Sequence, residues 1–216
     1  EIRNCDWSSD VLFRSGLKFS RINLAQGFDL YKPKVYEELK KKYKLERPRR
    51  IWVSTRCTVW CPFTSLNFRT EEQRAVLEQR RRKERAMFKL LIPFLLDILE
   101  NDPACELFWE WPHRCYGWDE PWILHLQQRL QELGKSWHSA RIDGCRYGLR
   151  SVSGGFLRTS WWIGTTSESF YHFYKLILAK DAMIMNKSKN LKPKPNAQCS
   201  DRKSTRLNSS HSSVSR

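Results

Sequence analysis

Apolar residues recur every three or four positions in several stretches of this chain, the spacing that gathers them on one face of a helix. The sequence Thr70-Glu71-Glu72-Gln73 offers an N-cap followed by acidic residues in the first turn, which favours a helix start. Pro93 should kink or split that long helix, and Gly134 should end the next one. We predict helices at residues 31–47, 71–99, 120–133 and 170–178.

Short apolar runs rich in β-branched and aromatic residues lie between these helices, as buried strands do. We predict strands at residues 51–53, 106–111, 137–143 and 157–165, and a loop at 55–70. Gly154-Gly155 lies in a turn-rich segment that would join the last two strands as a hairpin. The alternation of helices and strands predicts an α/β fold with an open, mostly parallel sheet, flanking helices and a C-terminal hairpin.

The composition suits a single domain that binds an anionic partner. The chain has 216 residues, 40% of them hydrophobic, which is enough for one packed core. No apolar run approaches the roughly 18 residues that a membrane span needs. The net charge is +16, and basic clusters at 40–42, 47–50 and 80–85 would usually be solvated helix faces. Together with 13% aromatic residues they favour nucleic acid as a partner, DNA more than RNA, and no membrane.

Three candidate sites follow the predicted strands, where ligands bind in sheets of this kind. Cys57 adjoins Arg56 and would be a nucleophile if positive charge favours its thiolate, or else a small buried hydrophobe. Glu110 lies between two tryptophans and could bind the amidine-like edge of a ligand or pair with an arginine. The glycines of 143–149 permit close backbone approach to a ligand, or simply a tight turn.

A metal site is a further alternative. Cys57-x₃-Cys61, His113-x-Cys115 and Cys145 could supply four ligands. Their spacing matches no common zinc pattern, so we assign no metal ligand and keep a zinc-stabilised interaction domain only as a third hypothesis.

Both ends of the chain resemble translated adapter DNA from a sequencing library. DWSSDVLFRS and DRKSTRLNSSH back-translate to stretches that are reverse complements apart from a short deletion near Val11. We therefore expect 1–15 and 201–216 to be adapter-derived and disordered. Residues 16–180 would form one domain, a fragment truncated at its N-terminus, and 181–200 a basic linker or tail.

Three segments beside the predicted strands carry a set of motifs: RIWVSTRCTVWCPFTSLN, LFWEWPHRCYGW and ARIDGCRYGLRSVSGGFLRTSWWIGTT. In this order they resemble an uncharacterised domain of retrotransposon-like polyproteins. That domain typically has a strand, S-P-P-C-T, a long helix, F-E-H/W-P, and C-x-F/Y-G-L before a glycine turn. It is in turn remotely similar to cytosine-5 DNA methyltransferases. The similarity spans about residues 27–167.

The resemblance implies a Rossmann-like fold that uses S-adenosylmethionine. On this basis Cys57 falls on the methyltransferase nucleophile and Glu110 on the glutamate that hydrogen-bonds the base edge. Arg146 or Arg158 lies near the arginine-bearing motif that supports a base flipped out of the stack. Asp29 would lie near the side that binds S-adenosylmethionine.

The chain also departs from the family pattern. Thr55-Arg56 stands where the family has two prolines, and no Gly-rich strand-to-helix turn precedes the first strand to hold the methyl donor. We therefore expect a methyltransferase-related domain of a mobile element that is catalytically degenerate or inactive as a fragment. It would not bind S-adenosylmethionine, although the intact family domain would. The alternative is a non-enzymatic, basic nucleic-acid-binding module, and for either we expect an intracellular location, with the nucleus as one option.

Overall fold

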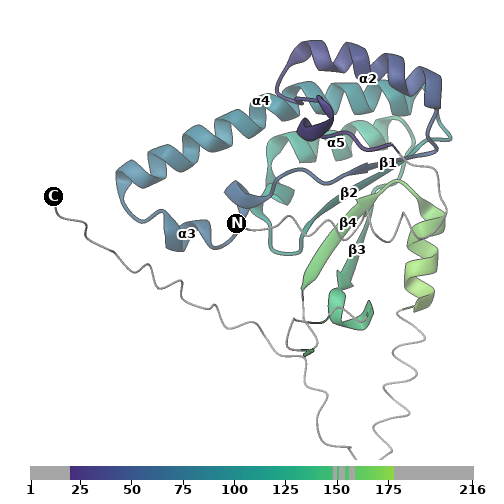
Figure 1. Cartoon of the computed structure of the whole chain (residues 1–216). Coiled ribbons are helices and arrows are strands. Elements are labelled where there is room, and N and C mark those ends of the chain that lie inside the picture. Colours follow the sequence, from purple (N-terminus) through teal and green to yellow (C-terminus); the bar gives the residue numbers. More distant parts are fainter. Residues whose placement is uncertain (1–19, 148–149, 151–153, 156–158, 178–216) are drawn as a thin grey trace, which may run out of the picture.

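Four strands in this chain form one mixed sheet with helices packed on it (Figure 1). The computed structural model describes residues 20–147, 150, 154–155 and 159–177; the expected adapter ends and the basic tail lie outside them. The strands are β1 (Arg50–Val53), β2 (Glu106–Pro112), β3 (His138–Asp143) and β4 (Ser160–Thr165), in the order β1-β2-β4-β3. The predicted strands and the α/β class are confirmed.

We predicted a mostly parallel sheet, and this prediction is wrong for two of the three strand pairings. β1 and β2 pair in parallel, whereas β4 is antiparallel to both β2 and β3. The reason is the C-terminal hairpin, which is confirmed: consecutive strands joined without a crossover helix must return antiparallel. β4 also inserts between β2 and β3, so that β3 keeps the direction of β1 and β2 without pairing with them. The carboxyl ends of β1, β2 and β3 therefore lie along one edge of the sheet.

The helices largely follow the predictions. They are α2 (Pro33–Glu46), α4 (Glu71–Asn101), α5 (Pro121–Glu132) and a last helix at 168–177. α4 begins at the expected cap, where the Thr70 hydroxyl accepts the Gln73 N–H at 3.3 Å. α5 is followed by Gly134, whose φ of +71° suits glycine at a helix end. In the last helix the Ser167 hydroxyl accepts the Phe170 N–H at 3.3 Å.

The local structure differs from the simplest expectation at two places. α4 continues through Pro93 as one helix instead of splitting there. The proline ring is exposed, and the buried neighbours Ile92 and Leu95 anchor the helix to the core, so packing outweighs the loss of one backbone hydrogen bond. The expected loop after β1 contains two short helices, η2 (Thr58–Trp60) and α3 (Thr64–Asn67). Short helical segments also occur at η1 (Leu24–Gln26), η3 (Tyr116–Asp119) and η4 (Gly144–Tyr147).

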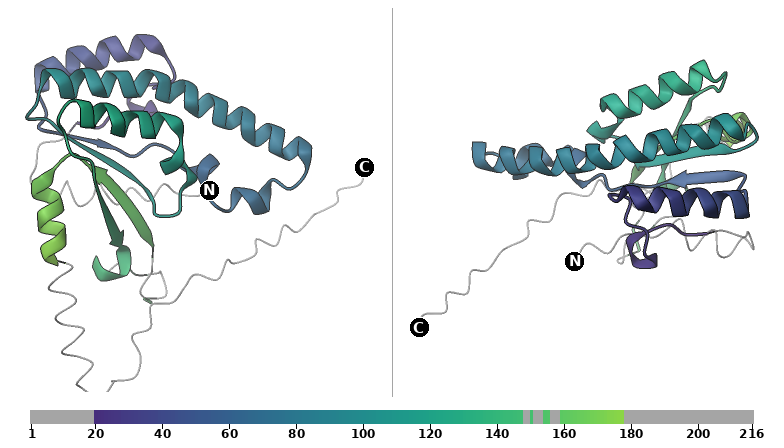
Figure 2. Two further views of the ribbon diagram at one scale, coloured as in Figure 1. Left: turned by 180° about the vertical axis from the view of Figure 1, so that it is seen from behind. Right: turned by 90° about the horizontal axis from the view of Figure 1, so that it is seen from above.

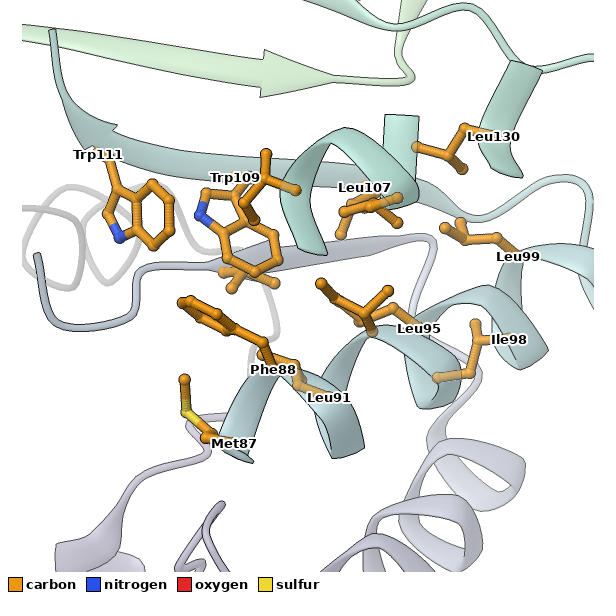
Figure 3. Packing of buried hydrophobic residues seen from close by; sticks show 14 of the residues in the cluster. Met87, Phe88, Leu91, Leu95, Ile98, Leu99, Leu107, Trp109, Trp111 and Leu130 are labelled. Atoms are coloured by element: carbon orange, nitrogen blue, oxygen red, sulfur yellow. The ribbon is translucent and has the colours of Figure 1, made fainter. Parts of the chain in front are cut away.

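The core lies between one face of the sheet and the layer formed by α2, α4 and α5 (Figures 1 and 2). Leu107, Trp109 and Trp111 alternate along β2 and point to this face, as a strand's period of two dictates. Phe88 of α4 meets the rings of Trp109 and Trp111 at centroid distances of 6.0 and 5.8 Å (Figure 3). Phe108 points to the other face, where Phe170 of the last helix meets it at 5.3 Å.

α4 is longer than the sheet it covers. Its N-terminal half, together with α3, projects past the edge at which β1 and β2 end (Figure 1). The loops that follow these two strands are therefore bounded by α4 on one side. No helix in the described part of the chain is long and apolar enough to cross a bilayer.

Candidate functional site

The candidate site lies at the carboxyl ends of the parallel strands β1 and β2. Val53, the last residue of β1, stands opposite Trp109 in this register, so that the loop after β1 runs beside the end of β2. The indole of Trp111 donates a hydrogen bond to the Thr55 carbonyl at 2.9 Å and fixes this loop. A buried tryptophan of β2 thus holds the segment that carries Cys57.

Cys57 is half-buried and directly precedes η2. Its carbonyl accepts the Trp60 N–H at 2.9 Å, which holds the loop in a tight turn. Burial raises the pKa of the Cys57 thiol, and the charges of Cys61 and Glu110 raise that pKa further. Glu110 therefore lies close enough to Cys57 to act on it electrostatically. Both predicted catalytic residues therefore lie near one edge of the sheet, but Cys57 packs against the main core while Glu110 faces the other side, and burial disfavours the Cys57 thiolate.

Glu110 faces away from the main core, on the same side of the sheet as Trp52. Its carboxylate accepts a hydrogen bond from the Trp52 indole at 2.9 Å. Burial raises the pKa of Glu110, and the Trp52 hydrogen bond partly offsets that increase. An indole N–H, rather than the arginine that we considered from the sequence, is thus its partner.

The loop after β1 is clamped onto α4 by two arginines that sequence analysis placed on a solvated helix face. Arg81 donates to the Val59 carbonyl at 3.1 Å, and its guanidinium lies 5.2 Å from the centre of the Trp60 ring. Arg85 lies 5.3 Å from the same ring and binds both carboxylate oxygens of Glu120, at 2.8 and 2.9 Å. Trp60 is 1% exposed. The clamp joins η2 to α4 and to the start of α5.

Sequence reasoning missed this clamp, although one signal for it was present. Arg81 and Arg85 are four residues apart and therefore share one helical face, and Glu120 is the first residue of the helix predicted at 120–133. Arg85 also binds Glu78 at 2.7 Å, and these hydrogen bonds raise the pKa of its guanidinium. Nothing in the sequence indicates that η2 packs against Arg81 and Arg85.

Asp29, the residue expected near the cofactor, lies in the segment between η1 and α2. Its carboxylate accepts the Tyr31 N–H at 3.2 Å and pairs with Lys32 at 3.6 Å. The Tyr31 hydroxyl donates to Glu84 of α4 at 2.8 Å, and burial together with this bond raises the tyrosine's pKa. The charge of Arg56 lowers the pKa of Tyr31, so the Asp29 segment lies near the Cys57 loop. The Asp29 carboxylate itself is bound by the nearby Tyr31 N–H and Lys32.

The third strand end reaches the same edge, but the structure describes it only in part. Asp143 ends β3, and its carboxylate accepts hydrogen bonds from Arg141 at 3.3 Å and from the Ser160 hydroxyl. The backbone of Arg146 lies in η4 directly after β3. The side chain of Arg146 and the whole of Arg158 lie outside the described residues, so their expected role in base binding stays a prediction.

The zinc alternative is not supported. Within the described residues, no group of three or more His, Cys, Asp or Glu side chains is arranged to hold a metal ion. Cys57, Cys61, Cys115 and Cys145 are all free thiols. Burial, with the charges of Cys57 and Cys61, raises the pKa of Cys115 to about 12, which opposes the thiolate form that zinc requires.

Comparisons with protein-family models, with curated proteins and with solved structures find no match to this chain. The function is therefore argued from the chemistry of its residues and from the resemblance of its motifs.

Proposed function

We propose that this chain is a nucleic-acid-binding domain related to cytosine-5 DNA methyltransferases and carried by a mobile element. In this proposal it holds an unstacked base against Cys57 and Glu110 and transfers no methyl group. The observation that carries the proposal is the placement of both residues near the carboxyl ends of the adjacent parallel strands β1 and β2, Cys57 on the loop after β1 and Glu110 near the end of β2. We also propose that the mixed sheet is a variant of the Rossmann-like fold and that the protein is located in the nucleus.

The chemistry around Glu110 suits the edge of a nucleobase. A base taken out of its stack is read by hydrogen bonds to its Watson–Crick edge and by contact with aromatic rings. Glu110 supplies the hydrogen-bonding group, and burial raises its pKa, so that it keeps its proton to a higher pH than an ordinary glutamate does. Trp52 lies beside it, is 42% exposed, and is stacked on Phe108 at 5.2 Å with the rings 9° from parallel. A flat aromatic surface and a polar group thus face the same space.

The state of Cys57 supports the proposed lack of catalysis. The attacking group in nucleophilic cysteine chemistry is the thiolate, which nearby positive charge normally favours. Here burial and the charges of Cys61 and Glu110 raise the pKa of the thiol instead. Arg56 is the cation nearest to Cys57 in the sequence, but its charge lowers the pKa of Tyr31 and is not among the causes of the Cys57 pKa shift.

The described residues do not fit S-adenosylmethionine. Asp29, the one residue expected on the cofactor side, is engaged by the Tyr31 N–H and by Lys32. The sequence before β1 offers no Gly-rich turn that would bring backbone N–H groups to a ligand.

Two measurements on the full chain test the proposal. The first is binding of fluorescent cytosine-containing oligonucleotides across a salt series, in which affinity should fall steeply as salt rises. Glu110→Gln should weaken binding to cytosine more than binding to an abasic site at the same position. Glu106→Gln is the matched control, since Glu106 lies on the same strand but binds Arg50 and Ser167 at the other end. Affinity that does not change with salt would refute the proposal.

The second measurement is transfer of a labelled methyl group from S-adenosylmethionine to DNA, by the wild type and by Cys57→Ser. We expect no transfer by either protein. Turnover by the wild type that Cys57→Ser abolishes would instead establish a methyltransferase.

A further inference from the structure

A groove outside the Cys57–Glu110 pair lies between α3, the projecting half of α4 and the loop after β2. Its volume is about 250 Å³, below the roughly 300–1,000 Å³ of clefts that enclose drug-sized ligands. It is lined by Thr64, Ser65, Phe68, Arg74, Leu77, Arg81 and Tyr116. The groove therefore has room for a single small unit, with two arginines and two aromatic rings on its walls.

Both arginines of the groove are available to an anion. The ion pairs of the basic segment 80–85 belong to Arg82 and Arg85, which bind Glu78 and Glu120. Arg74 and Arg81 form no ion pair among the residues that the structure describes. Arg81 is nevertheless held in place, because its Nε donates to the Val59 carbonyl and its guanidinium lies over Trp60. A guanidinium oriented in this way can bind phosphate oxygens through its remaining N–H groups.

The aromatic residues supply flat surfaces at the same place. Tyr116 is 49% exposed, although large aromatic side chains are usually well covered. Phe68 also lines the groove, and the Arg80 guanidinium lies over its ring, 5.7 Å from the ring centre. Rings interleaved with unpaired arginines are the pattern by which proteins bind single-stranded nucleic acid, with bases on the rings and phosphates on the cations.

The residues that line the groove are connected along the chain to the proposed base site. Thr64 follows Cys61 closely, and its hydroxyl donates to the Cys61 carbonyl at 2.8 Å. Tyr116 directly follows Cys115, whose pKa responds to the charges of Cys57 and Cys61. The two walls of the groove thus continue from the loops that carry Cys57 and that follow Glu110.

We propose that this groove binds one nucleotide of a single strand, next to the base held at Cys57 and Glu110. Arg74 and Arg81 bind the phosphate, and the base stacks on Tyr116. This inference rests on the proposed function, because the neighbouring base must belong to the same strand. Duplex nucleic acid binds less tightly than a single strand, because paired and stacked bases do not reach the ring.

The experiment measures anisotropy of a fluorescent oligo-dT and of a duplex of equal length with the full chain, between about 50 and 200 mM salt. Tyr116→Ala should weaken oligo-dT binding about tenfold, the effect of losing one stacked base. Tyr116→Phe should bind like the wild type, because the ring is kept. Arg74→Ala should lower the slope of log affinity against log salt by about one.

Matched controls lie outside the groove. Arg82→Ala removes a cation from the same helix, where the side chain is 79% exposed. Phe173→Ala removes an aromatic ring that is 62% exposed on the last helix. Either variant should leave the affinity for oligo-dT within about twofold of the wild type, and thermal melts should show that all five variants are folded.

The outcomes separate this inference from the proposed function. If the wild type binds and the groove variants match the controls, the groove assignment is wrong while the proposed function stands. If poly-glutamate displaces oligo-dT as well as unlabelled oligo-dT does, the groove binds acidic protein segments and the inference is overturned. If the wild type binds neither oligonucleotide, both the inference and the proposed function are wrong.

Discussion

The indole N–H of Trp52 donates a hydrogen bond to the carboxylate of Glu110 over 2.9 Å. Trp52 lies on the edge strand β1, and Glu110 lies on its parallel neighbour β2. The bond gives a partly buried carboxylate a neutral donor instead of a cation, so the charge of Glu110 is only partly compensated. Burial raises the pKa of Glu110, and the Trp52 hydrogen bond offsets that increase only in part. The charge of Glu110 in turn raises the pKa of Cys57.

Replacing the donor should change Glu110 directly. Trp52→Phe keeps an aromatic ring at this position but removes the indole N–H. Because the hydrogen bond from that N–H lowers the pKa of Glu110, this pKa should rise above its wild-type value in the variant. We also expect a loss of about 1 kcal/mol in the free energy of unfolding. NMR titration of the glutamate side chains and urea unfolding measure the two effects. Trp122→Phe, a substitution on α5, should change neither, and an unchanged pKa of Glu110 in Trp52→Phe would contradict the prediction.

The stability of the wild type should depend on the protonation of Glu110. Its pKa is higher in the folded than in the unfolded chain, so its contribution is fully present below the ordinary glutamate pKa. That contribution is lost as the pH rises through the folded pKa. Glu110→Gln cannot ionise, so its stability relative to the wild type should increase from pH 4 to pH 7. Urea unfolding of both proteins at pH 4 and pH 7 measures this change. If the stability of Glu110→Gln relative to the wild type decreased from pH 4 to pH 7, the prediction would be wrong.

The thiol of Cys57 should react slowly. Its pKa is raised, so alkylation by iodoacetamide near neutral pH should be slower than for a free cysteine in a peptide, and should accelerate at alkaline pH. Glu110→Gln removes a charge that raises this pKa and should speed the reaction. Mass spectrometry of labelled peptides follows Cys57 separately from Cys61. A rate at pH 7 above that of the peptide would show an activated thiolate and contradict the prediction.

The clamp formed by Arg85 should be a major source of local stability. Glu120 is 8% exposed, and Arg85→Ala leaves its carboxylate buried without a cation. We expect a loss of about 3 kcal/mol in the free energy of unfolding, because a buried charge left unpaired is costly. Arg82→Ala, which removes an exposed arginine one turn away, should cost no more than about 0.5 kcal/mol.

The double variant Arg85→Ala/Glu120→Gln tests the cause of that loss. It should recover part of the stability, because an uncharged amide replaces the unpaired carboxylate. Chemical denaturation measures all the variants in this series. No recovery in the double variant would mean that Arg85 acts through its packing on Trp60 rather than through its charge.

Much of the local structure of this protein could be predicted because its signals lie within a few residues of each other. The Thr70 cap begins α4 and Gly134 follows α5, as their side chains and backbone freedom require. The strands were evident from short apolar runs. Pro93 misled the prediction because a helix anchored by buried neighbours on both sides tolerates one missing hydrogen bond.

The candidate site could be predicted only in part. Cys57 and Glu110 were identified because Cys57 follows one short apolar run and Glu110 lies near the end of another, and the two runs form adjacent parallel strands. The partner of Glu110 could not be found in this way, since Trp52 and the carboxylate are 58 residues apart and meet only through the register of β1 and β2. The clamp on Trp60 was missed for the same reason.

By itself, then, the sequence determined the α/β class, the position of the main helices and strands, and a basic net charge. Those properties depend on neighbouring residues and on solvent. Only the tertiary structure decided that β4 inserts antiparallel between β2 and β3, that an indole partners Glu110, and that Arg81 and Arg85 lie over Trp60. These features depend on which segments, distant in the sequence, lie next to each other in the fold. The pairing of a strand and the pKa of a buried charged group are determined by the neighbour that the fold places beside them.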